Sequence, residues 1–246
     1  MENATTIALS RLVAQQHALD VTATNIANAA TPGFKAQRML FSDWLQREPR
    51  GAVPPGGQTE SYATDRATYR EREAGTLRQT GNPLDIALGN PEAWLTVQTK
   101  QGPRLTRAGH FELSASGTIV NENGDALLDS TGQPLRTSPS DSTLAIAGDG
   151  TLSGSNGPVG RIGTVRPDDA GKLTAEGGRH YAVNTPTQPV PGQVIQGALE
   201  DSNVQSITEL NRMMTDLREF QFTTQLVQGE TDRLNTAVDR ILKKGV

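Results

Sequence analysis

Apolar residues recur every three or four positions near the start of the chain, between Thr5 and Asn28, in a stretch without proline or glycine. The spacing predicts a helix of roughly 24 residues, or about 36 Å at ~1.5 Å per residue. Thr31-Pro32-Gly33 predicts its end, because proline disfavours helical geometry in the residue before it and glycine supplies a turn. The repeat comprises Leu9, Leu12, Gln16, Leu19, Ala23 and Ile26.

Charge is scarce along this first helix. Between Ala4 and Thr31 the full charges are Arg11 and Asp20. A helix with a solvated outer face usually carries more charge than that. Two interpretations stay open: the helix is buried inside one domain, or other subunits pack on most of its sides.

A longer repeat lies near the end of the chain. Its three-four spacing over more than four heptads, about 50 Å at ~1.5 Å per residue, predicts a helix with a coiled-coil seam. Polar Thr224 and Thr231 at seam positions favour packing in a larger array over a simple dimer. The repeat consists of Leu210, Met213, Leu217, Phe220, Thr224, Val227, Thr231, Leu234, Val238 and Ile241.

The middle of the chain alternates short apolar runs with turns. Nineteen of the 25 glycines lie between Gly75 and Gly197. Asn123-Gly124 and Asp149-Gly150 are strong hairpin turns, and strands spaced this closely favour an antiparallel β domain without crossover helices. The predicted strands fall in 84–88, 94–97, 110–113, 118–120, 126–128, 144–147, 161–165 and 194–199.

Together these patterns predict an α+β protein. We expect the N- and C-terminal helices, residues 1–34 and 203–246, to form a coiled-coil-like core domain. Residues 75–202 then form an inserted antiparallel all-β domain. Residues 35–74 are expected to be a linker and irregular extension, with Pro49 to Gly57 lacking any periodicity.

Composition excludes several classes of protein. The absence of cysteine rules out disulfides, thiolate metal sites and a cysteine nucleophile. A formal charge of -4 argues against nucleic acid as a partner. No apolar stretch reaches the ~18 residues of a membrane helix, and the N-terminus lacks the pattern of a cleaved secretory signal. We therefore expect no membrane insertion.

Candidate catalytic chemistry is sparse. His17, His110 and His180 lie in three different elements without the spacing of metal ligands. The segment from Asn121 to Asp125 resembles the start of a calcium loop, but alanine replaces the turn glycine at position 126 and glycine occupies the glutamate position at 132. We expect no catalytic residue, cofactor or metal. An enzyme would need His110 or His180 beside a carboxylate and an open cleft.

Four segments carry a family resemblance. Leu19–Lys35, with Asn25-Ile26-Ala27-Asn28 and Thr31-Pro32-Gly33-Phe34-Lys35, resembles the N-terminal signature of bacterial flagellar basal-body rod and hook proteins. Gly75–Leu88 and Leu199–Val204 are similar to the segments that enter and leave their β domain, and Ile207–Asp232 is similar to their C-terminal helix. The chain departs from the family at Gly89–Leu95, which replaces a glycine-rich double-phenylalanine stretch, and at Gly154–Gly163, which has no counterpart.

The resemblance implies a structural subunit of the flagellar rod, the axial drive shaft that transmits torque from motor to hook. A chain of this length with one β domain resembles the proximal rod subunits most and the distal rod subunits next. A non-flagellar coiled-coil fibre or adhesin stalk is the other alternative. The implied partners are other rod subunits in a helical assembly and the flagellar type III export apparatus. The implied place is the periplasm-spanning rod of the basal body, reached without a cleaved signal peptide.

The resemblance also implies an assembly interface. Leu12, Leu19 and Ile26 would face the apolar residues of the second helix, and the two asparagines of the signature would satisfy backbone groups. The expected interface comprises Leu9, Leu12, Leu19, Asn25, Ile26, Asn28, Thr31, Pro32, Gly33, Phe34, Leu210, Met213, Leu217, Phe220, Val227, Leu234, Val238 and Ile241.

Overall fold

A computed structural model describes residues 2–46, 60–71, 73–138, 144–169, 173–177, 179–182 and 186–243. The chain forms two units. The helical unit comprises Met1–Ala27, Gln37–Tyr69 and Gln205–Val246, and the β unit comprises Asn28–Ala36 and Arg70–Val204. The chain therefore passes between the units four times. Of the expected linker and irregular extension, residues 35–74, the part from 47 to 59 and residue 72 lie outside the described residues.

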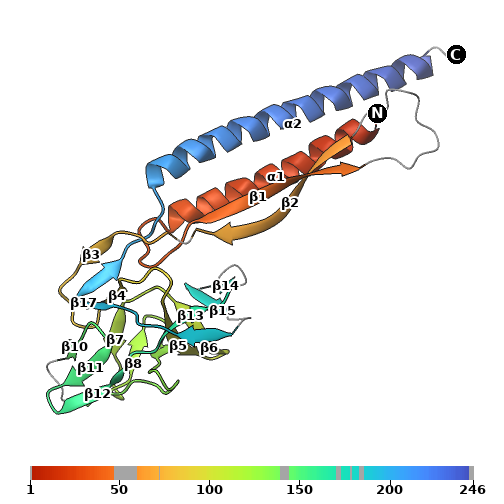
Figure 1. The fold of residues 1–246 in the computed structure, drawn as a ribbon. Helices are drawn as coiled ribbons and strands as arrows, with labels where there is room; N and C mark the ends of the chain where they lie inside the picture. Colours follow the sequence, from red (N-terminus) through yellow and green to blue (C-terminus); the bar gives the residue numbers. More distant parts are fainter. Residues whose placement is uncertain are drawn as a thin grey trace. The chain divides into compact units, whose positions relative to one another are not determined.

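The helical unit contains two long helices and a pair of strands. Helix α1 (Glu2–Ala27) and helix α2 (Ser206–Lys243) lie side by side and run in opposite directions (Figure 1). Strands β1 (Gln37–Gln46) and β2 (Glu60–Arg70) form a two-stranded sheet. After α1 ends, the amide of Thr31 donates to the carbonyl of Asn28, and Gly33 follows at a φ of 72°. Proline and glycine thus stop the helix where the sequence predicted.

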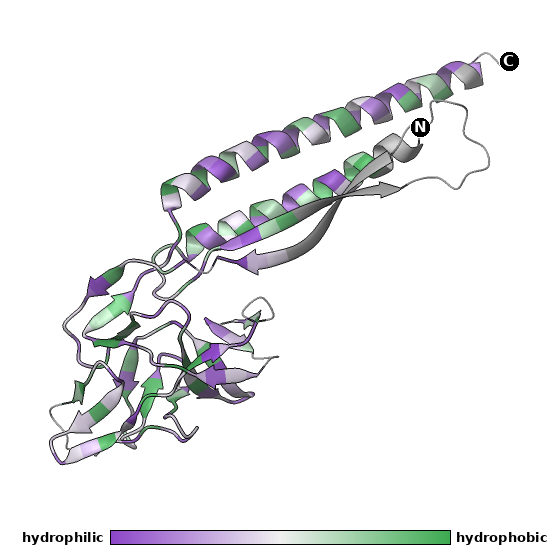
Figure 2. Cartoon of the chain, in the orientation of Figure 1, coloured by the Kyte–Doolittle hydropathy of each residue, from purple (hydrophilic) through white to green (hydrophobic). Residues whose placement is uncertain are grey.

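Small and polar side chains make up most of the buried surface of the helices. In α1 the buried residues include Ala8, Ala14, Gln15, Thr22 and Asn25, and in α2 they are Glu209 and Thr223. Many of the large apolar side chains are instead exposed, and Figure 2 shows hydrophobic and hydrophilic residues alternating along α2. The exposed apolar residues are Leu9, Val13, Ile207, Leu210, Met214, Leu217, Phe222, Leu226 and Val238.

The expected coiled-coil-like core is therefore wrong. A coiled coil would bury the whole seam of α2, but Leu210 and Leu217 are 48% and 41% exposed. Met213 and Phe220 from the same repeat are only half-buried, while Glu209 and Thr223 next to them are buried. The repeat spans a wider arc of the helix than one neighbour can cover, so it divides into an inward face and an outward face. The rest of the expected class, helices at both ends around an antiparallel β region, agrees with the structure.

The β unit is built from short antiparallel strands. Its largest sheet has the order β14-β15-β6-β5-β9-β8-β7, with β13 pairing with β5 and β16. Strands β10, β11 and β12 form a second sheet, and β17-β4 and β18-β3 are two-stranded. The strands are β3 (Leu77–Gln79), β4 (Ile86–Leu88), β5 (Trp94–Thr99), β6 (Gly102–Thr106), β7 (Phe111–Leu113), β8 (Ile119–Asn121), β9 (Ala126–Leu127), β10 (Ala145–Ile146), β11 (Thr151–Gly154), β12 (Gly157–Arg161), β13 (Thr164–Pro167), β14 (Thr174–Glu176), β15 (His180–Ala182), β16 (Thr187–Pro189), β17 (Val194–Gln196) and β18 (Ala198–Glu200).

One apolar core holds these strands together. Its members come from β4, β5, β7, β8, β9, β10, β11 and β17 and from the segments between strands. They are almost completely buried, unlike many apolar residues of the helices. The Asn123-Gly124 turn joins β8 to β9 with Gly124 at a φ of 82°, as the sequence predicted. The stretch Gly154–Gly163 supplies the β11-β12 hairpin. The core residues are Ile86, Leu88, Ala93, Leu95, Val97, Phe111, Ile119, Leu127, Leu135, Ile146, Leu152, Ile162 and Val194.

Candidate assembly surface

The expected interface residues fall into three groups by exposure. Leu9, Leu210, Leu217 and Val238 are exposed, and Asn25, Gly33 and Phe34 are buried inside their own units. The side chain of Ile241 lies outside the described residues. The half-buried group comprises Leu12, Leu19, Ile26, Asn28, Thr31, Pro32, Met213, Phe220, Val227 and Leu234.

A buried polar cluster joins both helices to β1 within the helical unit. The side-chain amide of Asn25 donates to the carbonyl of Gln37 (2.9 Å) and to Oε2 of Glu209 (3.1 Å), and its oxygen accepts from the Gln37 amide (2.8 Å). The Glu209 carboxylate also pairs with Arg38 at 2.6 Å. Asn25 and Glu209 are 0% and 1% exposed. Since buried polar groups need such partners, this cluster fixes how the helices and β1 meet.

The end of the N-terminal signature belongs to the β unit. Phe34 and Ala36 pack with Val204 in a small apolar cluster, and the Gly33 amide donates to the carbonyl of Glu200 (2.7 Å). A Cβ on Gly33 would lie 2.5 Å from the backbone of Arg107, so only glycine fits there. The end of the signature therefore packs closely against the backbone of the β unit.

Three charged side chains form a buried group at this position. The Lys35 ammonium pairs with one oxygen of Glu200, and Arg107 donates to the other oxygen at 3.1 Å. The three residues are 2%, 2% and 3% exposed. Burial lowers the pKa of Lys35 and that of Arg107, while the Glu200 carboxylate opposes both shifts. Glu200 also accepts from the Gly75 amide (3.1 Å), so this carboxylate connects three distant segments of the chain.

Cations and aromatic rings extend the group into the main sheet. The Arg70 guanidinium lies 5.3 Å from the ring centre of Phe34 and 5.1 Å from that of Tyr181. Tyr181 meets Trp94 edge to face at 4.9 Å, and Arg107 lies 5.6 Å from the Trp94 ring. Burial raises the pKa of Tyr181. Three side chains, Arg70, Tyr181 and Trp94, therefore connect Phe34 to Arg107 of the buried charged group.

Sequence reasoning did not assign roles to Glu200, Arg107, Arg70 or Glu209. Glu200 lies in one of the segments that resemble the family, but its partner Lys35 is 165 residues away in the chain. Spacing along the sequence gives no signal for such a contact. Glu209 lies beside the first residue of the apolar repeat, where a charged side chain is usually solvated.

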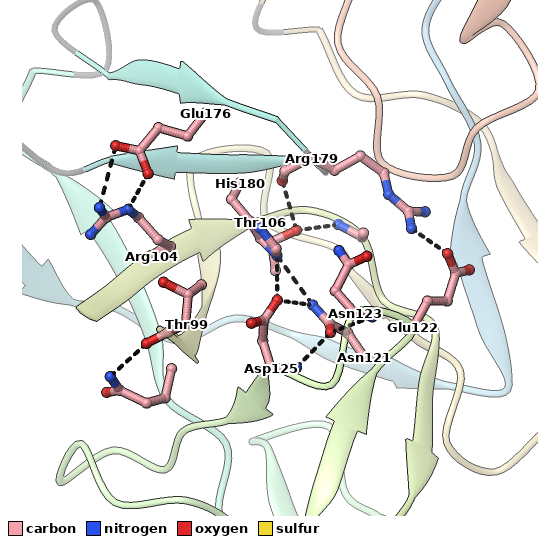
Figure 3. A network of polar contacts seen from close by, with 12 residues as sticks. Thr99, Arg104, Thr106, Asn121, Glu122, Asn123, Asp125, Glu176, Arg179 and His180 are labelled. Carbon is pink, nitrogen blue, oxygen red and sulfur yellow. Dashed lines mark hydrogen bonds and ion pairs between the residues drawn. The ribbon is translucent and has the colours of Figure 1, made fainter. Parts of the chain in front are cut away.

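Two histidines, His110 and His180, lie beside carboxylates, which is one of the two features expected of an enzyme; the other is an open cleft. His110 Nδ1 is 2.7 Å from Asp85, and His180 Nε2 is 3.3 Å from Asp125. Figure 3 shows the network around His180, in which the Asn121 amide also reaches Nε2 (3.1 Å). Burial lowers the pKa of His180, against the opposing charge of Asp125.

An open groove of about 870 Å³ lies beside His180. The Thr106 hydroxyl in the same network donates to the carbonyl of Arg179 (3.0 Å), so its proton is not directed to the imidazole. Arg104 forms a two-contact ion pair with Glu176. The groove is therefore lined in part by polar groups that are paired with one another. Its lining comprises Thr99, Lys100, Gln101, Arg104, Asn123, Asp125, Glu176, Gly177 and His180.

Among the residues that the structure describes, no group of three or more His, Cys, Asp or Glu side chains is arranged to hold a metal ion. None of the helices described is long and apolar enough to span a membrane.

Comparison with known proteins matches both ends of the chain to rod families. Residues 6–35 match the flagella basal body rod protein family, and residues 195–240 match the flagellar basal body rod FlgEFG protein C-terminal family. The chain is 32% identical to the flagellar basal-body rod protein FlgF of Caulobacter vibrioides over 99% of both chains. It is 29% identical to FlgF of Escherichia coli over 88% of this chain and 89% of that one, and 27% identical to FlgG of Bacillus subtilis over 91% and 93%. The chain therefore belongs to the flagellar basal-body rod protein family.

Proposed function

We propose that this structural rod subunit stands in the proximal part of the rod and passes torque along the flagellar axis. The observation that carries the proposal is the near full-length similarity to FlgF proteins, together with the apolar side chains exposed on both helices. Membership of the rod protein family supports a structural role for this chain. It gives no support to catalysis at the His180 groove.

The exposed apolar residues are proposed to contact other rod subunits directly. Leu9, Leu210, Leu217 and Val238 are between 41% and 59% exposed. Each fully buried side chain of this size contributes about 1.5–3 kcal/mol, so covering several per subunit favours assembly strongly. The half-buried positions of the expected interface, including Met213 and Phe220, would lie at the edges of these contacts. Ile241 would extend the same contacts.

The buried members of the expected interface are proposed to act by positioning. Asn25 fixes the helices to β1, and Phe34 and Lys35 fix the signature segment inside the β unit. Torque passes through a subunit only if its parts resist deformation, and buried hydrogen-bonded groups of this kind have few alternative arrangements. The proposed division is thus between residues that contact neighbours and residues that hold those contacts in place. Asn28, Thr31 and Pro32 would belong to the second set.

The site of action is proposed to be the periplasm-spanning part of the basal body. The family resemblance supports export through the flagellar type III apparatus without cleavage of a signal peptide. A chain without cysteine suits this route, because it crosses into an oxidising compartment without forming wrong disulfides.

A Leu217→Asp substitution tests the proposal. Leu217 is 41% exposed, so the isolated variant should fold as the parent does by circular dichroism. A charge inside a subunit contact is costly, so cells carrying the variant should lose swimming and yield no complete basal bodies. Thr215→Asp places the same charge on another face of α2 and serves as the matched control. Normal motility of the Leu217 variant would contradict the proposed contact.

A place in the distal rod is the second candidate, because FlgG proteins also match over most of the chain. Labelling the tagged chain in purified basal bodies separates the two. Label near the membrane-proximal end of the rod supports the proximal position, and label along the outer part supports the distal one. Label outside the basal body would reject both.

A further inference from the structure

The side chain of Asn121 holds the turn between β8 and β9. Its amide oxygen accepts from the backbone amides of Asn123 and Asp125, both at 2.9 Å. In an amide side chain the oxygen accepts and the nitrogen donates, so these two bonds fix the orientation of the amide group. The nitrogen of Asn121 is therefore a donor on the side of the group that faces His180 of β15.

Two other side chains approach this nitrogen in Figure 3. Nδ2 of Asn121 lies 3.1 Å from Oδ2 of Asp125 and 3.1 Å from Nε2 of His180, and the last two atoms are 3.3 Å apart. The amide nitrogen carries two hydrogens, one for each neighbour. Its bond to His180 requires a lone pair on Nε2, so this arrangement needs the neutral imidazole with its proton on Nδ1.

The protonated ring does not fit the same three contacts. A proton on Nε2 turns this atom from an acceptor into a donor, and it then opposes a hydrogen of Asn121 over 3.1 Å. The new N–H can instead donate to Asp125, but only if the amide group of Asn121 moves aside. His180 is 8% exposed, and an amide hydrogen that loses its acceptor in such surroundings costs free energy. Protonation therefore exchanges the contact with Asn121 for a charge-assisted one with Asp125.

The other charges around the ring are largely paired with one another. Arg104 pairs with Glu176 and Arg179 pairs with Glu122, both at 2.6 Å, so Asp125 is the acidic group in direct contact with the ring. Burial lowers the pKa of His180, the two arginines add to this shift, and Asp125 and Glu176 oppose it. The ring is therefore neutral at pH 7 and takes up its proton in acidic solution. The charged groups around the ring are Lys100 and Arg104 of the β5-β6 hairpin, Glu122 and Asp125 of the β8-β9 turn, Glu176 of β14 and Arg179 beside β15.

We propose that His180 is a proton-operated switch of the β8-β9 turn. With the neutral ring, Asn121 links the backbone of the turn to β15. With the protonated ring, Nε2 donates to Asp125, the amide of Asn121 is displaced, and the turn loses the two bonds that this amide makes with its backbone. Asn123 and Asp125 also line the open groove, so the shape and charge of the groove change with the turn. The switch lies within the β unit and does not require a place in the rod.

His110 provides a comparison within the same unit. Its Nδ1 lies 2.7 Å from Oδ1 of Asp85, and Asn82 donates to the same oxygen at 3.0 Å. The ring and the amide both donate to the carboxylate here, so they do not oppose each other. Protonation adds a hydrogen at Nε2, which lies 3.7 Å from Glu112, and leaves both bonds in place. Protonation of His110 should therefore leave the neighbouring backbone unchanged.

NMR of the full chain measures the ring and the turn in one sample. Above the titration midpoint, the nitrogen chemical shifts of His180 should report the tautomer with its proton on Nδ1. On acidification, the hydrogen-exchange protection of the Asn123 and Asp125 amides should fall several-fold, with the same midpoint as the ring. The Asp85 amide beside His110 should keep its protection. A neutral ring with its proton on Nε2, or turn protection that stays constant while His180 titrates, would overturn the inference.

Two substitutions test the cause of the change. His180→Gln removes the titration, so turn protection should no longer depend on pH, whereas His110→Gln is the matched control and should keep the dependence. Asn121→Asp replaces the donor by an acceptor and keeps an oxygen for the backbone amides of the turn. The midpoint of His180 should then move to higher pH, and acid should no longer weaken the turn. An equal loss of protection in the His180→Gln chain, or a midpoint that Asn121→Asp moves to lower pH, would contradict the switch. If His180→Gln does not fold, the titrations of the parent and of Asn121→Asp decide.

Discussion

The two units of the protein bury opposite kinds of side chain. In the β unit, Leu95, Val97 and Phe111 are completely buried, and most of the large apolar side chains described there belong to one core. In the helical unit, Asn25 and Glu209 are buried while leucines, methionine and phenylalanine are exposed. The β unit therefore has the apolar burial of an independently stable domain. The helical unit instead exposes large apolar side chains, a kind of surface that marks protein–protein contacts when it is contiguous.

This difference explains why the family signature ends inside the β unit. Gly33, Phe34 and Lys35 leave the first helix and immediately enter the stable unit, where Glu200 pairs with Lys35. The segment that follows α1 is thus anchored in the unit that has an apolar core of its own. Substitutions at buried residues of the β unit should lower the stability of the isolated protein. Substitutions at exposed apolar residues of the helices should instead affect assembly in cells.

The largest effect is expected for Glu200→Gln. The change leaves the buried Lys35 and Arg107 cations without a counter-charge, and breaking one partner of a buried ion pair costs about 3–5 kcal/mol. Urea unfolding of the isolated protein should show this loss in the transition of the β unit. Asp201→Asn removes the exposed ion pair with Arg78 and should cost less than about 1 kcal/mol. Equal losses for the two variants would show that the buried group does not anchor the segment.

A pair of leucine substitutions compares the units directly. Leu95→Ala opens space in the core and should lower the free energy of unfolding by about 2–5 kcal/mol. Leu217→Ala removes an exposed side chain and should change the stability of the monomer by less than about 0.5 kcal/mol, since it loses few contacts. The order should reverse for assembly in cells, where Leu217 is proposed to be covered. A large loss of monomer stability for Leu217→Ala would mean that the helical unit is self-sufficient after all.

The sequence predicted where helices and turns lie better than it predicted which face of a helix is buried. Local signals such as the Asn123-Gly124 turn and Thr31-Pro32-Gly33 placed a hairpin and a helix end, because a turn depends on the residues within it. The repeat through Leu210, Met213 and Leu217 predicted a helix, but it did not show which part of that wide apolar arc faces α1. In the structure hydrogen-bonded Asn25 and Glu209 decide this, and a polar contact across 184 residues has no periodic signal.

The same limit applies to the candidate site. The family segments pointed to residues 19–35 and 199–204 as important, and these segments do meet in the β unit. Nothing in one sequence shows that Lys35 and Glu200 pair or that Arg70 lies between two aromatic rings. His180 is a further example, because it lies in a polar network with Asn121 that the spacing of the histidines in the sequence did not predict.

A smaller effect is expected from pH in the β unit. Burial, with the cations Arg179 and Arg104 nearby, lowers the pKa of His180, while Asp125 and Glu176 oppose the shift. The unfolded chain then binds a proton more readily than the folded one, so stability is fully present above about pH 6.5 and falls as the pH decreases through that value. Urea unfolding between about pH 8 and pH 5 should show this slope, and His180→Gln should reduce it. Stability that rises on acidification in the parent alone would contradict the direction of the shift.

The smallest effect is expected at a glycine in the middle of α2. Gly229 is exposed, and a Cβ placed there meets no atom within 4 Å. Gly229→Ala should therefore stabilise the helix by about 0.5–1 kcal/mol, because alanine loses less conformational entropy on folding. Helical circular dichroism during heating measures the change. Gly81 also has open space but adopts a φ of 76°, so Gly81→Ala should instead destabilise the β unit. If Gly229→Ala stabilises the helix but weakens motility, the rod requires α2 to deform at Gly229. If the variant swims as the parent does, the substitution affects only the stability of the free helical unit.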